Sequence, residues 1–286
     1  MKLATIRTGS GDHLAAVDGE DVVDLSVAAP ALPVTMPELL AQGQAGRDAV
    51  AAAIASGTGR SPLSEANLGA PVSRPGKFCA IGLNYADHIA ETNSKTPEFP
   101  TVFVKLPSCV NGPYDDIWRP RVSEQLDYEG ELGFVIGQRC KHVPVEKAHE
   151  VIAGYTIIND VSVRDYQRRT SQFTLGKSFD THGVMGPWIV TADEIGDPHD
   201  LDIKTTVNGE VRQDSNTKHL IFDCYTLVAA LSEVCTLEPG DVVATGTSSG
   251  VAAAMSPQAW MVPGDVCRVE IQGIGAVENT VVPEPS

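Results

Sequence analysis

Two glutamates lie two positions apart in LDYEGELGFVIG, residues 126–137, where apolar residues alternate as in a β-strand. Glu129 and Glu131 therefore point the same way, with Cα atoms about 6.5–7 Å apart. Two like charges repel each other and resist burial, so a solvated strand face explains most pairs of this kind. Here glycine and valine follow on the same face. These neighbours favour a shared Mg²⁺, Mn²⁺ or Ca²⁺, ions that prefer carboxylate oxygens.

Asp160 is the candidate for a third carboxylate ligand. It ends the apolar strand GYTIIND, residues 154–160, and precedes a segment with a helical pattern. A side chain at such a junction often reaches a cleft, although an aspartate there can also cap the helix that follows.

A possible general base lies in GLNYADHIAET, residues 82–92. His88 and Glu91 are three residues apart, so they share one face of a helix and can form a hydrogen bond. A carboxylate that holds an imidazole orients it and makes it more basic. The alternative is a surface His–Glu pair, which contributes little.

Four polar side chains beside apolar or glycine-rich sequence form a third group: Lys105, Arg164, Gln167 and Lys177. The alternatives are salt bridges at a rim for the first three and a turn lysine for Lys177. The chain has 21 basic and 37 acidic residues and a net charge of −16. Such a surface repels nucleic acid and anionic lipid, so an anionic substrate needs local cations of this kind.

The composition predicts an ordinary globular protein. Of the 286 residues, 42% are hydrophobic and 20% are charged. We expect no signal peptide and no membrane span, because the N-terminus has no apolar run and no stretch of about 18 apolar residues occurs. The six cysteines lie far apart without a C-x-x-C pair. They are therefore expected to be reduced thiols in a cytoplasmic protein.

The elements that position these residues divide near residue 70. Residues 1–70 predict a small α+β N-terminal domain, with short strands and an alanine-rich helical stretch at 36–57. Residues 71–286 predict a mostly β catalytic domain, including a hairpin at Asn208 and Gly209. Its expected helical segments are 84–92, 160–169 and 221–234.

The sequence from about Lys77 to Val282 resembles the fumarylacetoacetate hydrolase (FAH) family. The resemblance lies in the combination and order of its segments, which include GLNYADHIAE, LDYEGELGFVIG, AGYTIINDVSVRDYQ, LGKSFDTHGVMGPWIV and LEPGDVVATGTSSGV. The resemblance implies a mixed, mostly β fold, an FAH-type β-roll or sandwich, with an N-terminal extension like that of many bacterial members. It also implies a homodimer that uses Mg²⁺ or Mn²⁺, with Ca²⁺ as a substitute. The implied metal ligands are Glu129, Glu131 and Asp160.

The resemblance also implies roles for the other candidates. His88 and Glu91 match the pair that activates water, and Lys177 matches a lysine near the metal. The positions expected to bind substrate are Tyr85, Lys105, Arg164, Gln167 and Thr247. The founding member has a further aspartate ligand where this sequence reads Asn84 and Tyr85. The smaller bacterial members with three carboxylates are therefore the better comparison.

The implied function is hydrolysis of a C–C bond in a 2,4-diketo acid, in aromatic or sugar-acid catabolism. Candidate substrates are acylpyruvates such as fumarylpyruvate and maleylpyruvate, fumarylacetoacetate, and diketo-deoxy sugar acids. The alternatives are an oxaloacetate decarboxylase or tautomerase, a hydroxymuconate-type isomerase or decarboxylase, and an inactive metal-binding homologue. The His88–Glu91 pair argues against the last, because metal binding does not require it. The polar segment 90–100 is expected to form a lid that orders on ligand binding.

Overall fold

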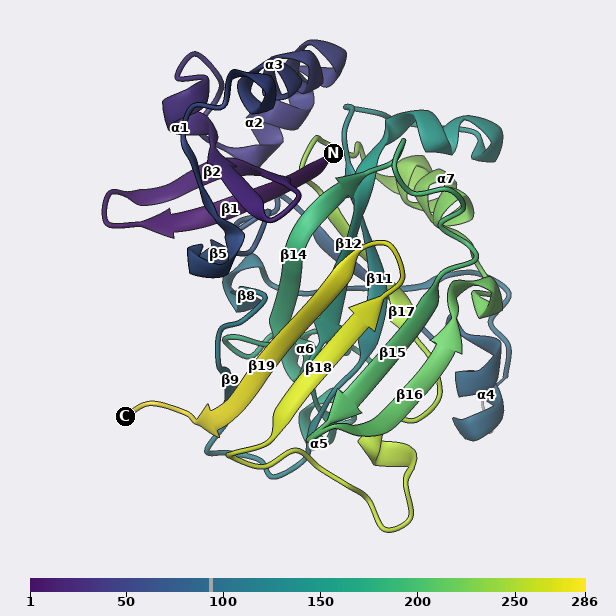
Figure 1. Ribbon diagram of the computed structural model, residues 1–286. Helices are drawn as coiled ribbons and strands as arrows, with labels where there is room; N and C mark the ends of the chain where they lie inside the picture. Colours follow the sequence, from purple (N-terminus) through teal and green to yellow (C-terminus); the bar gives the residue numbers. More distant parts are fainter. Residues whose placement is uncertain (93–94) are drawn as a thin grey trace.

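A large sheet forms the centre of the molecule in the computed structural model, which describes residues 1–92 and 95–286. Its strands are β1 (Lys2–Thr8), β2 (Gly11–Asp18), β3 (Asp21–Asp24), β4 (Arg60–Pro62), β5 (Leu68–Gly69), β6 (Phe78–Gly82), β7 (Thr101–Val104), β8 (Val110–Asn111), β11 (Gly130–Ile136), β12 (Ile152–Asp160), β14 (Gly183–Thr191) and β17 (Val242–Thr247). The strand order is β4-β3-β2-β1-β14-β12-β11-β17-β6-β7, with β5 beside β1 and β8 beside β14 (Figure 1).

A second sheet packs on the face formed by β11, β12 and β14 (Figure 1). Its order is β16-β15-β18-β19-β9, from β9 (Ile117–Arg119), β15 (Asp202–Val207), β16 (Glu210–Asn216), β18 (Val266–Ile271) and β19 (Gly275–Pro283). The expected hairpin joins β15 to β16, with Asn208 and Gly209 both left-handed at φ 52° and 79°. The prediction of a mostly β fold is confirmed.

Strand β11 is buried on both faces, which explains its apolar character. Leu132 and Phe134 pack into the core between the two sheets, while Val135 joins a second core on the opposite face. Residues of the N-terminal helices, including Leu40 and Val50, close that second core. The carboxylates that precede Val135 on its face are therefore held away from bulk water.

The helices are α1 (Leu25–Ala28), α2 (Met36–Ala41), α3 (Gly43–Ser56), α4 (Ala86–Thr92), α5 (Arg164–Gln167), α6 (Thr174–Lys177) and α7 (Cys224–Val234). In the described part of the chain, none of them is both long and apolar enough to cross a membrane.

Two expected elements are broken by a small additional sheet. Strand β13 (Ser162–Val163) pairs with β10 (Leu126–Asp127). The helix expected over 160–169 is therefore reduced to α5, because its first residues form this strand. For the same reason the strand expected over 126–137 is two strands, with residues 128–129 between them.

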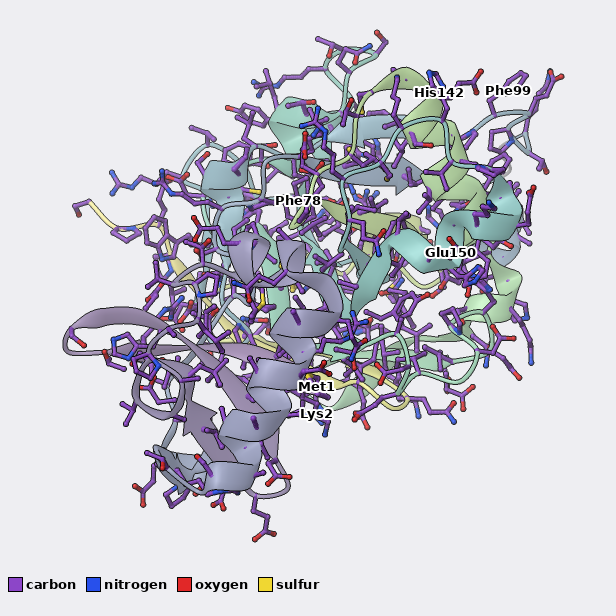
Figure 2. All side chains as sticks on the ribbon, turned by 90° about the horizontal axis from the view of Figure 1, so that it is seen from above. Met1, Lys2, Phe78, Phe99, His142 and Glu150 are labelled. Carbon is purple, nitrogen blue, oxygen red and sulfur yellow. The ribbon has the colours of Figure 1, made fainter. Side chains whose placement is uncertain are left out.

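The N-terminal strand is part of the large sheet. Lys2 and Leu3 of β1 pair with Val190 and Ile189 of β14. The Met1 ammonium lies 2.6 Å from Glu194 Oε1, and Figure 2 shows Met1 and Lys2 beside the N-terminal helices. The division into domains 1–70 and 71–286 stays a prediction.

Candidate metal centre and catalytic dyad

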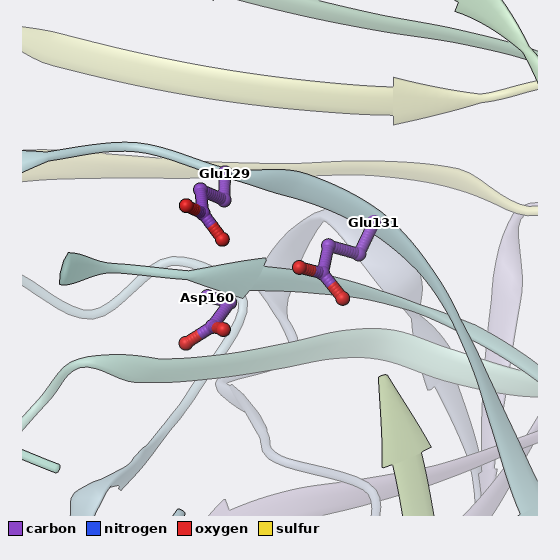
Figure 3. Close-up of side chains that lie close together, drawn as sticks. All are labelled: Glu129, Glu131 and Asp160. Carbon is purple, nitrogen blue, oxygen red and sulfur yellow. The ribbon is translucent and has the colours of Figure 1, made fainter. Parts of the chain in front are cut away.

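Three carboxylates converge where β11 and β12 run antiparallel. Glu131 lies in β11, Asp160 ends β12, and the Asp160 amide donates to the Glu129 carbonyl at 2.9 Å. One carboxylate oxygen from each residue lies within 4.8 Å of the others, and all three side chains are buried. Figure 3 shows the three carboxylates facing a common space. The structure therefore brings together the three residues expected to bind metal.

Two buried lysines lie against these carboxylates. Lys177 Nζ is 2.6 Å from Glu129 Oε2 and 2.9 Å from Asp160 Oδ2. Lys105 Nζ is 2.6 Å from Asp160 Oδ1 and also donates to the Lys177 carbonyl. Burial alone would lower the pKa of Lys177, but the Asp160 and Glu129 carboxylates raise it above its ordinary value. Lys177 therefore remains an ammonium group inside the protein.

Arg164 joins the cluster to a fourth carboxylate, Asp127, to which no role was assigned from the sequence. Its Nε lies 2.8 Å from Asp127 Oδ2, and its Nη1 lies 2.6 Å from Glu129 Oε1. Burial opposes ionisation of Glu129, but Lys177 and Arg164 outweigh it and lower the pKa of Glu129 to about 2. Asp127 also accepts the amides of Ala252 and Ala253 at 2.8 and 3.0 Å. The sequence feature that could have identified Asp127 is its position on the predicted strand face that carries both glutamates.

The charges of this cluster balance only when Glu131 is protonated, and its ionised form needs a further cation. Four buried carboxyl groups meet only three cationic side chains among the described residues, and Glu131 has no ion pair there. Burial, then Asp160 and Glu129, raise the pKa of Glu131 well above its ordinary value. A divalent cation among these oxygens would relieve that excess. The donor set therefore fits Mg²⁺ or Mn²⁺ held by Glu129, Glu131 and Asp160.

The raised pKa of Glu131 predicts an unusual pH dependence for the chelator-treated protein. The folded chain holds this proton more tightly than the unfolded chain does. The stability that the protonated Glu131 side chain contributes is therefore lost as the pH rises from about 4.3, the ordinary glutamate pKa, through the raised pKa of Glu131. Stabilisation by Mg²⁺ should increase over the same range, because the cation needs the deprotonated carboxylate. Melting temperatures between about pH 5 and 8, with and without Mg²⁺, test this; parallel curves would contradict it.

His88 and Glu91 form the expected dyad on α4. His88 Nδ1 lies 3.1 Å from Glu91 Oε2, and the Gly250 amide donates to Glu91 Oε1 at 2.8 Å. Gly250 has φ +103°, and a Cβ there would lie 1.9 Å from the Arg212 carbonyl oxygen. Only glycine fits this position, which holds the Glu91 carboxylate from the side opposite the imidazole. The sequence feature that could have identified this contact is the pair of glycines in TGTSSG. The other glycine of the pair, Gly246, also donates its amide to a carboxylate of the site, that of Glu131, at 2.7 Å.

A cavity of about 390 Å³ lies against this dyad. It is lined by Leu83, His88, Glu91, Arg164, Gln167, Arg168, Phe173, Val251, Ala253 and Ala254. Gln167 Oε1 accepts from Arg164 Nη1 at 2.9 Å, which directs the amide nitrogen of Gln167 away from the guanidinium. Imidazole, carboxamide and guanidinium groups therefore line one cavity together with apolar side chains.

Tyr85 and Thr247, expected to bind substrate, lie outside the lining of this cavity. Tyr85 is fully buried, and its hydroxyl has no hydrogen-bond partner among the described residues. Thr247 Oγ1 donates to the Gly130 carbonyl at 3.0 Å and accepts from Gln213 at 2.7 Å. Their roles stay predictions.

The segment 90–100, expected to be a lid, includes residues 93–94, which lie outside the described residues. Phe99 within it is exposed (Figure 2), and β7 follows at the end of the large sheet with Val102 and Val104 partly in solvent. An exposed apolar edge strand is a surface that a second subunit could cover. The homodimer stays a prediction.

Loss of Asp127 should destabilise the protein strongly although it leaves the three candidate metal ligands in place. Asp127→Ala leaves the buried Arg164 guanidinium and three backbone amides, those of Tyr128, Ala252 and Ala253, without this acceptor. We expect the free energy of unfolding, measured with urea, to fall by about 3–5 kcal/mol. Glu270→Ala, which removes an exposed partner of Arg268, is the control and should change it by less than about 1 kcal/mol. Equal effects would show that Asp127 does not hold this part of the site together.

The family model described as "Fumarylacetoacetate (FAA) hydrolase C-terminal" matches residues 77–282. The chain belongs to the fumarylacetoacetate hydrolase family. It is 42% identical over 277 residues to "Oxaloacetate tautomerase FAHD2A, mitochondrial" from Bos taurus, an alignment that covers 96% of this chain and 88% of the relative. The resemblance noted in the sequence is therefore confirmed.

Solved structures of this FAH family support the same fold. Maleylpyruvate hydrolase from Sphingobium sp. SYK-6, in complex with manganese(II) and pyruvate, superposes with TM-score 0.84 at 32% identity, covering 100% of both chains. A 5-carboxymethyl-2-hydroxymuconate delta-isomerase from Mycobacterium smegmatis gives 0.78 at 35% identity, covering 99% of this chain and 100% of the isomerase. These FAH relatives are enzymes, named as a tautomerase, a hydrolase and an isomerase.

Proposed function

We propose that this FAH-family chain is a keto–enol tautomerase of oxaloacetate, moving a proton between C3 and the 2-oxo oxygen. One observation carries the proposal: the His88–Glu91 dyad lines the same cavity as Arg164 and Gln167, which places a base and donors for carboxylate and carbonyl oxygens around one space. The extent of the match to the bovine tautomerase, 42% identity over 96% of this chain, supports the choice of reaction.

The cofactor of the proposed enzyme is Mg²⁺ or Mn²⁺, held by Glu129, Glu131 and Asp160. When bound, it would polarise the 2-oxo carbonyl and make the neighbouring C3 proton more acidic. Lys177 and Lys105 hold the carboxylates of Glu129 and Asp160 in place through contacts of 2.6–2.9 Å. Manganese bound in the maleylpyruvate hydrolase supports this part of the proposal.

His88 is the proposed base for the C3 proton. Glu91 accepts the hydrogen at Nδ1, which makes Nε2 the basic nitrogen of the ring. Gly250 fixes Glu91 in turn, so the imidazole keeps its orientation through the reaction. The amide nitrogen of Gln167 donates to the substrate oxygen that gains charge as the proton leaves C3. Return of the proton to that oxygen completes the conversion to the enol.

The second candidate is C–C bond hydrolysis of an acylpyruvate such as maleylpyruvate, the reaction favoured from the sequence. The same dyad could take a proton from water, and the maleylpyruvate hydrolase structure covers the whole chain. That relative is less similar in sequence than the tautomerase, 32% against 42%. Aromatic catabolism belongs to this candidate. A cytoplasmic location also stays a proposal, since the bovine relative is named as mitochondrial.

The deciding experiment compares three rates with one preparation of the protein and Mg²⁺. We expect faster decay of the ultraviolet absorbance of enol oxaloacetate, with much slower release of CO₂ from oxaloacetate and of pyruvate from maleylpyruvate. Rapid pyruvate release without faster enol decay would assign the chain to the second candidate. Absence of all three activities in metal-loaded protein would favour the inactive homologue.

A further inference from the structure

We infer that Arg168 selects dicarboxylic substrates by binding the carboxylate farthest from the 2-oxo group; this inference rests on the proposed function. Arg168 lines the cavity together with His88 and Arg164. It is the C-cap of α5, in the αR conformation, and its amide donates to the Arg164 carbonyl at 3.1 Å. Four residues apart on one helical turn, the two arginines lie on the same side.

The other cations of the site are already used by carboxylates of the protein. Lys105, Lys177 and Arg164 each form buried ion pairs at 2.6–2.9 Å. Within the described ranges, 1–92 and 95–286, the Arg168 side chain has no hydrogen bond or ion pair of its own. Its guanidinium is therefore available to an anion that enters the cavity, and its fork of donors matches a carboxylate.

The two arginines lie at different depths in the cavity, and this difference determines which end of a substrate each of them binds. Arg164 is buried beside the metal ligands, and its Nη2 has no partner among the described residues. Arg168 is exposed at the rim. The cavity that both arginines line also includes Leu83, Phe173 and Val251, which suit a short carbon chain. The metal ligands are not part of this lining, but Arg164 is, and its Nη1 lies 2.6 Å from Glu129 Oε1. A dicarboxylate can therefore place its 2-oxo acid end beside Arg164, next to the metal ligands, and its second carboxylate at the rim.

The overall charge makes such a rim cation consequential. A chain of net charge −16 repels a dianion more strongly than a monoanion, so a local positive group must offset that field. Monocarboxylic 2-oxo acids have no second carboxylate that could bind Arg168. The residue therefore distinguishes oxaloacetate from pyruvate, which differ by one carboxylate.

The test compares Arg168→Gln with Arg169→Gln. Arg169 is the neighbouring exposed arginine, stacked on Tyr166 and outside the cavity lining. With Mg²⁺ present, calorimetry measures the dissociation constants of oxaloacetate and pyruvate. We expect Arg168→Gln to weaken oxaloacetate about tenfold, to leave pyruvate within about twofold, and to raise KM more than it lowers kcat. Arg168→Lys should recover part of the loss, and Arg169→Gln should bind both ligands as the unchanged protein does.

Two results would overturn the inference: an unchanged oxaloacetate-to-pyruvate affinity ratio in Arg168→Gln, or an unchanged protein that shows no preference for oxaloacetate. The first result includes equal weakening of both ligands, which would indicate a general change in the cavity. Failure of the proposed function would be distinguishable from failure of this inference. A protein that prefers oxaloacetate through Arg168 but does not accelerate enol decay would keep the inference and lose the tautomerase.

Discussion

Glu131→Gln should no longer gain thermal stability from Mg²⁺, and its rate of enol–keto conversion should fall by about 10³-fold, since a metal ion supplies several kcal/mol of charge stabilisation. Glutamine keeps the size of the side chain and can still accept the Gly246 amide. It cannot supply the third negative charge. Without metal, this variant should be more stable near pH 8 than the unchanged protein, because it removes a buried carboxyl whose pKa is raised.

The matched control is Glu270→Gln, which changes an exposed carboxylate of β18 that pairs with Arg268 and is not one of the three candidate ligands. It should keep the response to Mg²⁺ and the full rate. Calorimetric titration with Mg²⁺ measures the loss of Mg²⁺ binding in Glu131→Gln directly. Tight Mg²⁺ binding by Glu131→Gln would show that the cation sits elsewhere or that two carboxylates suffice.

His88→Asn should reduce the same reaction by about 10²–10⁴-fold, the usual contribution of a positioned general base. Unlike the Glu131 variant, it should bind Mg²⁺ as before, because His88 is not one of the three carboxylate ligands. Glu91→Gln should give a smaller loss in the same direction, since the imidazole remains but its orienting charge is gone.

Stopped-flow measurement of enol decay and a Mg²⁺ titration on each variant separate the two roles. The control is His142→Asn, an exposed histidine with φ 53°, a conformation that asparagine tolerates well. A full rate in His88→Asn would leave the dyad as a surface pair without a catalytic role. Loss of Mg²⁺ binding in that variant would place His88 with the metal site instead.

The sequence was most informative where a single segment carried the signal. Alternation in 126–137 predicted that Glu129 and Glu131 point the same way, and their carboxylates do converge although residues 128–129 lie between two strands. The i, i+3 spacing predicted the His88–Glu91 contact. Both follow from local geometry, which short-range patterns specify.

Contacts between distant segments were not predictable from such patterns. The Asp127–Arg164 pair joins residues 37 positions apart, and the Gly250–Glu91 contact spans 159 positions. A helix over 160–169 was wrong at its start because Val163 pairs with Leu126 in β10–β13, a tertiary preference that overrides the local pattern. The partner of β1 likewise lies far along the chain.

Strand β1 is synthesised before all of its neighbours in the sheet, and β14, whose edge it joins, is synthesised last among them. At about 5–20 residues per second, β1 waits on the order of 10–40 s before residues 183–191 exist. The β1–β2–β3 meander can pair within itself during that time, with the edge meant for β14 uncovered. Such an edge can pair with other chains, so the newly made protein is open to aggregation through β1 during this interval.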